Sequence, residues 1–317
     1  MRVLVTGADG FVGRHLVRHL LQAGDAVAAG CRPGGPAVNW SRYSATGTPV
    51  QVVPLELGDD GSVRAALAWG PEAVVHLAAV ASVREAQGDP GAAWDVNASG
   101  TARLVGAAAA LKESGDADPV VLVVSSGEVY GAGSGAPRQE TDPLEPVSAY
   151  AASKVGAEVA AMEAWRRAGL RIVVARPFSH TGPGQAVTYA VPAWVSRIKA
   201  AHRSGASQVA VGNLRPVRDL LDVRDVVAAY RRLLVDGRPG EAYNVARGEG
   251  VALADVFRQL ATLMGTAVSP VADPALTRRA DITHLVGDST KLRRATGWAP
   301  TLSLAQTLQE LVDAEAD

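Results

Sequence analysis

The junction between the first strand and the first helix constrains the fold of this chain more than any other feature. Residues 3–6 are mostly β-branched, residues 6–13 read TGADGFVG, and an amphipathic helical pattern follows. Glycines spaced as Gly7, Gly10 and Gly13 permit a tight turn, let the backbone approach a pyrophosphate, and pack helix on strand. The free N–H groups at the start of such a helix suit phosphates. The junction therefore predicts a dinucleotide-binding unit; on its own, the glycine spacing would also fit an ordinary strand–helix turn.

Strand-like and helix-like patterns alternate along the first half of the chain. Short buried strands are expected at Val3–Thr6, Ala26–Gly30, Val50–Leu55, Ala73–Leu77, Val120–Val124 and Arg171–Ala175. Helical patterns lie between them, among others at Ala92–Leu111 and Ala149–Ala168. This alternation predicts an α/β fold with a Rossmann-type doubly wound parallel sheet, which binds its ligand beyond the carboxyl ends of the strands.

The pattern loosens after Pro177. Helices are expected at Val191–Arg203, Leu221–Leu234, Ala252–Leu263 and Leu304–Ala314, a strand at Ala242–Val245, and long loops at Gly30–Thr48 and Gly127–Pro146. We expect residues 1–178, joined by 220–246, to form the dinucleotide-binding domain. Residues 179–219 and 247–317 are expected to form a smaller C-terminal α/β substrate-binding lobe.

Charge and cysteine content exclude several other classes of protein. The net charge of −1 provides no field that would draw the chain to nucleic acid or to an acidic membrane. The single cysteine, Cys31, excludes an internal disulfide framework and a cysteine-rich metal site. No apolar run approaches the ~18 residues of a membrane span, and none at the N-terminus suits secretion. We expect a cytoplasmic protein with no metal site.

Tyr150 and Lys154 lie one helical turn apart in the run SAYAASK, and Ser126 stands at the end of the fifth strand pattern. A free phenol titrates near pKa ~10 and exchanges protons poorly at neutral pH. An ammonium at i+4 favours the phenolate, so Lys154 is expected to lower the pKa of Tyr150, with the positive ring of an oxidised nicotinamide adding to the shift. Ser126 would hold the substrate oxygen while Tyr150 moves the proton. These residues predict a hydride-transfer enzyme.

The end of the second strand carries information about the cofactor. An NAD-specific site places Asp or Glu there for the ribose 2′-hydroxyl, whereas this chain has Gly30, Cys31 and Arg32. An arginine can hold a 2′-phosphate with two hydrogen bonds, and the absence of a carboxylate from this stretch removes a repulsion. The stretch favours NADP(H), with NAD(H) as the alternative if Arg32 is only a solvated loop residue.

The chain resembles the extended short-chain dehydrogenases, in the branch of nucleotide-sugar epimerases, dehydratases and reductases. The resemblance runs almost end to end through TGADGFVG, HLAA (76–79), VNASGT (96–101), SSGEVYG (125–131), YAASK (150–154), RPFSHTGPGQ (176–185), VGNLRPVRD (211–219), DVRDVV (222–227) and GDSTKLRRATGWAP (287–300). These motifs are specific for the family and less specific for one reaction. RPFSHTGPGQ and VGNLRPVRD are most similar to the GDP-4-keto-6-deoxy-D-mannose reductases and their GDP-mannose 4,6-dehydratase relatives.

The resemblance implies roles for individual residues. The implied cofactor contacts are Gly7, Gly10, Phe11, Val12, Gly13, Arg32, Glu56, Leu57, Leu77, Ala78, Ala79, Tyr150, Lys154, Pro177 and His180. The implied substrate contacts are Ser82, Ser179, Arg218 and Arg278, with both arginines on the diphosphate. Either arginine could instead form a surface salt bridge. Asn97 would brace the catalytic strand and helix, or else lie on a helix surface. Ser179 replaces the asparagine that is usual in these relatives, which leaves open the identity of the sugar and of the nucleotide base.

Two positions separate the reactions that the resemblance allows. The family's dehydratases carry an acidic or hydroxyl residue after the catalytic Ser/Thr and then a glutamate; here the pair is Gly127 and Glu128. Glycine donates no proton, which leaves Glu128 as a candidate base without its partner. The 4-epimerases usually bind NAD through an acidic residue where this chain has Arg32. We therefore predict NADPH-dependent reduction of GDP-4-keto-6-deoxy-D-mannose to GDP-D-rhamnose, with a nucleotide-sugar 4-epimerase and then a 4,6-dehydratase as alternatives.

Two further expectations concern the whole chain. A dinucleotide-binding sensor without catalytic activity would usually have lost the tyrosine or the lysine, and both are present here. The helices at Ala92–Leu111 and Ala149–Ala168 match those through which family members pair, which implies a homodimer. Both helices are rich in alanine, which would suit close packing against a second subunit or against the chain's own sheet.

Overall fold

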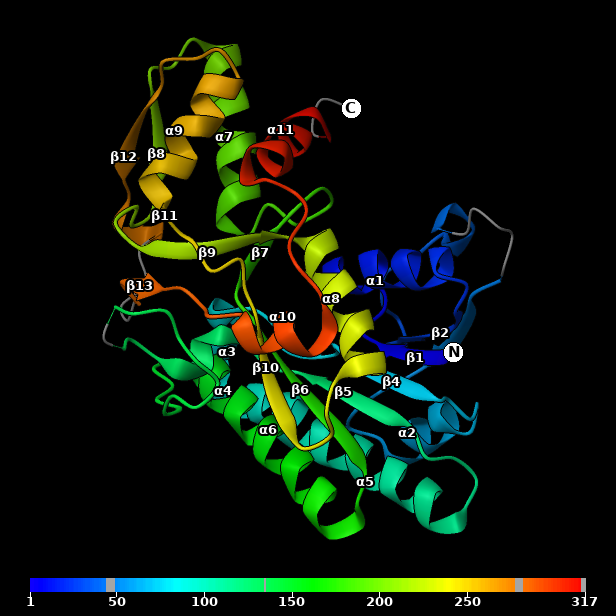
Figure 1. Cartoon of the computed structure of the whole chain (residues 1–317). Coiled ribbons are helices and arrows are strands. Elements are labelled where there is room, and N and C mark those ends of the chain that lie inside the picture. Colours follow the sequence, from blue (N-terminus) through cyan, green and yellow to red (C-terminus); the bar gives the residue numbers. More distant parts are fainter. Residues whose placement is uncertain (44–48, 134, 277–281, 315–317) are drawn as a thin grey trace.

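The computed structural model of the chain describes residues 1–43, 49–133, 135–276 and 282–314. A seven-stranded sheet forms the centre of its larger part (Figure 1). The strands are β1 (Arg2–Thr6), β2 (Ala26–Cys31), β3 (Gln51–Pro54), β4 (Ala73–His76), β5 (Val120–Val124), β6 (Arg171–Pro177) and β10 (Glu241–Val245). Their order is β10-β6-β5-β4-β1-β2-β3, and all pairs are parallel.

The sheet winds in both directions from β1. Thr6, at the end of β1, lies in register with Gly30 of β2 and with His76 of β4, so the carboxyl ends of these three strands meet at one edge. The predicted doubly wound α/β fold is confirmed. The six strands predicted in the first half of the chain agree with β1–β6 to within two residues at either end, and the strand expected at Ala242–Val245 is β10.

Helices cover both faces of this sheet because its strands bury side chains on both sides. Val3 and Val5 pack on one face, where the helices are α1 (Phe11–Gln22) and α8 (Val223–Asp236). Leu4 packs on the other face, against α2 (Asp60–Leu67), α5 (Gly100–Ser114) and α6 (Ala149–Ala168). All three strand side chains are fully buried, which explains why the strands read as continuous apolar runs.

The helix predicted at Ala92–Leu111 is interrupted. Its residues form α4 (Pro90–Trp94), a π-helical turn at Asp95–Ser99 and then α5, preceded by a separate short helix α3 (Val83–Gly88). A π turn inserts one extra residue into the helical repeat and often marks a functional position. The prediction of a regular helix was therefore wrong at the turn that carries Asn97.

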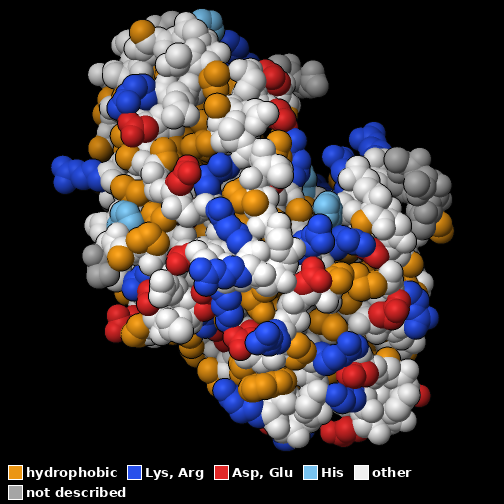
Figure 2. Space-filling view, viewed as in Figure 1, with side chains coloured by type: hydrophobic (Ala, Val, Ile, Leu, Met, Phe, Trp, Pro, Cys, Tyr) orange, Lys and Arg blue, Asp and Glu red, His pale blue; other side chains and the backbone are white. Residues whose placement is uncertain are grey.

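A smaller lobe lies beyond the carboxyl ends of the strands. It contains α7 (Ala190–Ser204), α9 (Leu253–Leu263) and α11 (Leu304–Ala314), with β7 (Ser179–Thr181), β8 (Gln208–Val211), β9 (Val217–Asp222), β11 (Gly250–Ala252), β12 (Ser269–Ala272) and β13 (His284–Leu285). Its core includes Trp194, Ile198, Phe257, Leu260 and Leu308. In Figure 1 this lobe stands above the main sheet, and Figure 2 shows the outline notched between the lobe and the part that holds α1. Basic and acidic side chains are interspersed over the visible face (Figure 2).

The strands of the small lobe were not predicted, because they are short and lack the continuous apolar runs of the buried parallel strands in the main sheet. The helix expected from Leu221 begins two residues later, at Val223, because His180 and Thr181 of β7 lie in register with Leu221 and Asp222 of β9. The two expected long loops each contain a 3₁₀ turn, at Trp40–Tyr43 and at Gly127–Tyr130. A further helix, α10 (Thr290–Thr296), packs beside β10.

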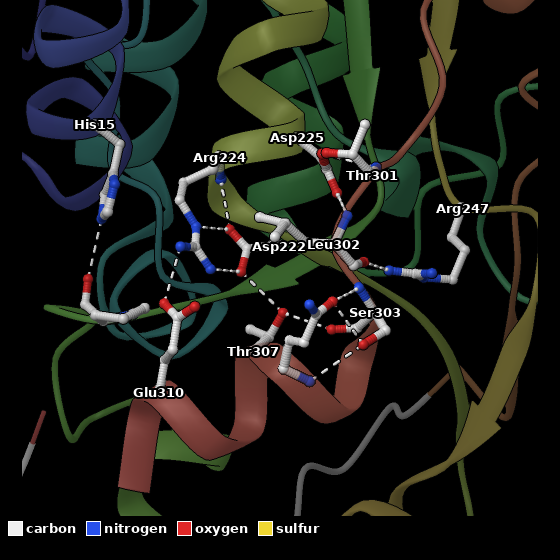
Figure 3. A network of polar contacts seen from close by, with 12 residues as sticks. His15, Asp222, Arg224, Asp225, Arg247, Thr301, Leu302, Ser303, Thr307 and Glu310 are labelled. Carbon is white, nitrogen blue, oxygen red and sulfur yellow. Dashed lines mark hydrogen bonds and ion pairs between the residues drawn. The ribbon is translucent and has the colours of Figure 1, made fainter. Parts of the chain in front are cut away.

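The last part of the chain is tied to the start of α8 by buried carboxylates (Figure 3). Asp225 accepts hydrogen bonds from Thr301 N–H at 3.0 Å and from Leu302 N–H at 3.1 Å. Asp222, which is fully buried, accepts from Thr307 Oγ1 at 2.8 Å and pairs with Arg224. These bonds hold α11 against the small lobe and the preceding segment against the main sheet.

Candidate active site

Two glycines of the glycine-rich turn are packed too closely against backbone to be replaced by a larger residue. Gly7 has φ +65°, and a Cβ there would lie 2.9 Å from backbone atoms of Ala78, beyond the end of β4. A Cβ on Gly13 would lie 2.3 Å from the Gly7 carbonyl oxygen. The turn therefore packs directly on the segment after β4, and neither Gly7 nor Gly13 could carry a side chain without displacing backbone. This cradle fits a dinucleotide pyrophosphate, because close backbone approach and free N–H groups are what such a ligand needs.

A chain of hydrogen bonds connects this turn to the π-helical turn. Thr6 Oγ1 accepts from Leu77 N–H at 3.1 Å and from Ala78 N–H at 3.0 Å, so its own hydrogen goes to His76 Nδ1 at 2.8 Å. His76 Nε2–H then donates to Thr101 Oγ1 at 3.0 Å, and Thr101 donates to the Asn97 carbonyl at 2.5 Å. Burial, with the nearby Lys154 ammonium, lowers the pKa of His76 to about 3. The neutral imidazole thus holds two strand ends and a helix in one arrangement.

Asn97 itself joins the segment after β4 to the helix that carries the predicted catalytic residues. Its side chain accepts from Val80 N–H at 2.8 Å and donates to Val80 O at 3.1 Å and to Ser153 Oγ at 2.9 Å. Ser153 Oγ in turn donates to the Tyr150 carbonyl at 2.8 Å. The brace expected of Asn97 is therefore present, and Asn97 is 1% exposed rather than on a helix surface.

Ser126, Tyr150 and Lys154 meet at the carboxyl end of β5. Lys154 is on α6, one turn beyond Tyr150, and its Nζ donates to the Val124 carbonyl at 2.9 Å. Ser126 caps the 3₁₀ turn that follows β5 by accepting from Glu128 N–H at 3.2 Å. The Ser126 side chain also lies close enough to the Tyr150 phenol to lower its pKa. The structure therefore brings the three predicted residues together.

The pKa of Tyr150 moves in the direction opposite to the one expected from the sequence. Burial of the phenol raises the pKa of Tyr150, the Glu128 carboxylate adds to the rise, and the Ser126 side chain opposes it. Burial also lowers the pKa of Lys154 to about 8, with Glu158 one turn further along α6 opposing the change. The expected lowering by Lys154 was wrong for the protein alone, because loss of solvent outweighs the neighbouring charge and Lys154 is directed to a carbonyl.

Two further side chains lie close enough to act on Tyr150. Glu128, predicted as a candidate base, raises the pKa of Tyr150 and is half-buried. Tyr189 also raises the pKa of Tyr150, from its position just before α7 in the small lobe. Tyr189 could not be predicted from the sequence, because no motif marks it and only the folding of the small lobe brings it near Tyr150.

Gly127 is packed under an aromatic ring. A Cβ at Gly127 would lie 3.1 Å from ring atoms of Phe178, and a Cβ at Gly287 would lie 2.4 Å from the same ring. Phe178 is buried, and its ring stacks on Tyr130 with centroids 6.3 Å apart. The Phe178 ring thus crowds the position after Ser126, and any side chain there would have to displace the ring by a few tenths of an ångström.

The remaining predicted cofactor residues surround the same strand ends. Leu77–Ala79 follow β4, and Glu56 and Leu57 follow β3, with Leu57 buried. Phe11, which with Val12 opens α1, stacks on the ring of His180 with centroids 6.4 Å apart. His180 Nδ1 donates to the Phe178 carbonyl at 3.0 Å, one residue beyond Pro177.

The end of β2 differs from the sequence expectation. Arg32 follows β2 and is exposed, as a phosphate-binding side chain would be. Residues 30–32 carry no carboxylate, but the glycine-rich turn brings one close to this strand end, which the sequence alone did not indicate. A Cβ on Gly35 would lie 3.0 Å from Asp9 Oδ2, and the Asp9 carboxylate contributes to raising the pKa of Cys31 to about 11. The sequence signal was the Asp inside TGADGFVG, which is remote along the chain from β2.

The predicted substrate residues are distributed over both parts of the molecule. Ser82 caps α3 by accepting from Glu85 N–H at 3.4 Å. Ser179 of β7 and Arg218 of β9 lie on neighbouring strands, and the Arg218 guanidinium donates to the Val217 carbonyl at 3.0 Å. Arg278 lies outside the described residues. Ser179 and Arg218 are thus brought near each other on adjacent strands of the small lobe.

Comparison with known proteins gives a consistent family. Residues 4–311 match the model of the family GDP-mannose 4,6 dehydratase. The chain is 35% identical to GDP-6-deoxy-D-mannose reductase of Pseudomonas aeruginosa, over 98% of this chain and 96% of that protein. It is 30% identical to UDP-glucose 4-epimerase of Mycolicibacterium smegmatis, over 99% and 98% of the two chains. The solved structure of RMD from Pseudomonas aeruginosa complexed with NADPH superposes with a TM-score of 0.80 at 32% identity, covering 99% of this chain and 98% of that one. The chain therefore belongs to the GDP-mannose 4,6-dehydratase family and is an enzyme of the extended short-chain dehydrogenase/reductase type.

Proposed function

We propose that this enzyme uses NADPH to reduce a nucleotide-linked 4-keto-6-deoxy sugar, and that its substrate is GDP-4-keto-6-deoxy-D-mannose, which it converts to GDP-D-rhamnose. The observation that carries the proposal is the contact between Gly127 and Phe178 beside a complete Ser126, Tyr150 and Lys154 site. Gly127 has no side chain that could serve as the acid of dehydration, Phe178 crowds the place where one would stand, and the three residues needed for reduction are present. The identity to the Pseudomonas reductase supports the GDP-linked sugar.

In this reaction Tyr150, Ser126 and Lys154 each have a separate role at the C4 carbonyl of the sugar. When bound, the nicotinamide cofactor supplies the hydride for the C4 carbonyl carbon. Tyr150 gives its proton to the C4 oxygen, and its raised pKa keeps that proton available at neutral pH. Ser126 hydrogen-bonds the same oxygen and orients it. Lys154 stays largely protonated near neutral pH and provides a positive charge beside the developing alkoxide.

The cofactor assignment and the substrate contacts are part of the proposal. Arg32 suits a 2′-phosphate because its guanidinium is exposed at the end of β2. Ser82, Ser179 and Arg218 are proposed to bind the nucleotide sugar, with Arg278 added from outside the described residues. The division into a dinucleotide-binding domain and a substrate lobe, at the bounds given above, remains part of the proposal.

A homodimer is proposed as the working form. The outer face of α5 and α6 carries a groove of about 640 Å³ lined by Trp94, Ala98, Ala102, Val155 and Val159, among others. Trp94 and Val159 are 45% and 64% exposed, which is unusual for large apolar side chains on adjacent elements. A second copy of the same face would cover both side chains.

No helix among the described residues has the length and apolar character to cross a membrane. The cytoplasmic location stays a prediction.

The experiment that tests the reaction follows NADPH absorbance after the enzyme is added to freshly generated GDP-4-keto-6-deoxy-D-mannose. The dTDP- and UDP-linked 4-keto sugars serve as parallel substrates. We expect stoichiometric NADPH consumption with the GDP sugar alone. No consumption with any of the three, together with nicotinamide retained through purification, would contradict the reductase and favour an enzyme that recycles its own cofactor, first of all a 4-epimerase, the reaction of the Mycolicibacterium relative.

A further inference from the structure

Two oppositely charged side chains approach the end of β2 from different elements. The backbone of the glycine-rich turn reaches this strand directly, since Ala8 N–H donates to the Gly30 carbonyl at 3.2 Å. The next residue, Asp9, lies beside Cys31, and its backbone N–H and its carboxylate shift the pKa of the Cys31 thiol in opposite directions. A tight turn at Arg32–Gly35 follows, closed by Gly35 N–H donating to the Arg32 carbonyl at 3.0 Å.

The Asp9 carboxylate is aimed at that turn. The point where a Gly35 Cβ would stand is 3.0 Å from Asp9 Oδ2 and 3.0 Å from the Arg32 carbonyl oxygen. Asp9 is half-buried and Arg32 is exposed. With the residues that the structure describes, neither the Asp9 carboxylate nor the Arg32 guanidinium forms a hydrogen bond or an ion pair. Both charges are therefore left for a ligand at the edge of the sheet.

We propose that Asp9 determines cofactor specificity together with Arg32, by accepting a hydrogen bond from the adenosine ribose 2′-hydroxyl of NAD(H) and repelling the 2′-phosphate of NADP(H). In dinucleotide-binding folds the group that recognises the 2′ position stands at the end of the second strand, where a carboxylate selects the hydroxyl and an arginine the phosphate. This chain supplies both groups, the arginine from the strand and the carboxylate from the turn. The enzyme consequently uses either cofactor, with a preference for NADP(H) that is smaller than Arg32 alone would give.

Since this assignment rests on the dinucleotide site proposed above, the test measures binding of cofactor fragments rather than turnover. The probes are 5′-AMP and adenosine 2′,5′-bisphosphate, which differ only in the 2′-phosphate, titrated into the full-length protein by calorimetry. The variants are Asp9→Asn, which keeps the size and removes the charge, and Arg32→Ala. Asp313→Asn, an exposed carboxylate on α11, makes the same change in net charge elsewhere.

Asp9→Asn is expected to tighten the bisphosphate about fivefold to tenfold, the size expected when one unit charge is removed near a phosphate at a partly exposed site. It should weaken 5′-AMP by about threefold at most, because the amide oxygen still accepts from the hydroxyl. Arg32→Ala should weaken the bisphosphate and leave 5′-AMP nearly unchanged, and Asp313→Asn should change neither. The same ratios should appear with NADP⁺ and NAD⁺.

An unchanged ratio of the two affinities in Asp9→Asn would overturn the role of Asp9 while leaving the dinucleotide site in place. Failure of the wild-type protein to bind either fragment, with neither dinucleotide binding, would overturn the dinucleotide site itself. Circular dichroism establishes that each variant is folded, and Asp9→Ser provides a second neutral side chain should the asparagine disturb the turn.

Discussion

Asn97 donates a hydrogen bond to Ser153 Oγ at 2.9 Å, across 56 residues of sequence. One partner stands on the π-helical turn after β4, and the other lies between Tyr150 and Lys154 on α6. Since Asn97 also forms two bonds with Val80, the amide holds the catalytic helix to the segment expected to lie along the cofactor. The position of the Tyr150 hydroxyl therefore depends on a side chain that does not reach it.

Replacing Asn97 with Ala should lower both stability and turnover. The change removes three hydrogen bonds and leaves the half-buried N–H and C=O of Val80 without their partner, at a cost of about 2–4 kcal/mol in the free energy of unfolding. It should lower kcat more than it raises KM, because the helix moves and the substrate contacts do not. Urea unfolding and steady-state kinetics measure the two effects. The exposed Asn39→Ala is the control, and an unchanged kcat would contradict a positioning role.

Tyr150→Phe should abolish reduction and spare cofactor binding. Loss of the proton donor is expected to reduce kcat by about 10²–10⁴-fold. Tyr43→Phe removes a phenol hydroxyl from the 3₁₀ turn after β2 and should leave kcat unchanged. The measurement is NADPH oxidation alongside NADPH affinity. If Tyr150→Phe retains full activity, the proton comes from another group, and Glu128 would be the first to test.

Much of this site could be predicted from the sequence because it is built from local patterns. The spacing of Tyr150 and Lys154 is a helical turn, and α6 begins and ends at the predicted residues. The arrangement around Gly127 could not be predicted, because Phe178 and Gly287 approach it from distant parts of the chain. The position of the Asp9 carboxylate near the end of β2 could not be predicted either, because Asp9 lies more than 20 residues away along the chain. The pKa direction of Tyr150 failed for a related reason, since burial depends on the whole fold and not on spacing along one helix.

Gly127→Asp should not convert the enzyme into a dehydratase. The Cβ alone would lie 3.1 Å from the Phe178 ring, so Gly127→Ala is expected to cost about 1–3 kcal/mol and Gly127→Asp more. Gly127→Asp should cost less stability in a Phe178→Ala background than in the wild type, although Phe178→Ala is itself destabilising because Phe178 is buried. Gly88→Ala, where nothing lies within 4 Å of the added Cβ, is the matched control. Thermal unfolding tests whether Phe178 crowds residue 127. Equal melting temperatures for Gly127→Ala and Gly88→Ala would show that the Phe178 ring moves aside without cost.

His76 should make the protein sensitive to acid. In the folded protein its pKa is lowered to about 3, whereas in the unfolded chain it titrates near the ordinary value of 6.5. Between these values the unfolded chain binds more protons, so stability falls as pH drops from 6.5 towards 3. His76→Gln should lose less stability than the wild type between pH 7 and pH 4.5. His202 is exposed, so His202→Gln should lose as much stability as the wild type over the same range. Urea unfolding at the two pH values gives the slopes; identical slopes for His76→Gln and wild type would contradict the assignment.

Val159→Glu should separate the proposed dimer. Val159 is 64% exposed on α6 and lines the groove that also contains Trp94, so a charge there would be buried without a partner at an interface between two copies. Val235→Glu introduces the same charge at a residue of similar exposure on α8, on the opposite side of the sheet. We expect light scattering to give a dimer for wild type and Val235→Glu and a monomer for Val159→Glu. A wild-type monomer at micromolar concentration would refute the dimer, whereas a Val159→Glu dimer would place its interface elsewhere. Because α6 also carries Tyr150 and Lys154, separation of the subunits is expected to lower kcat as well, through loosening of the helix that positions both side chains.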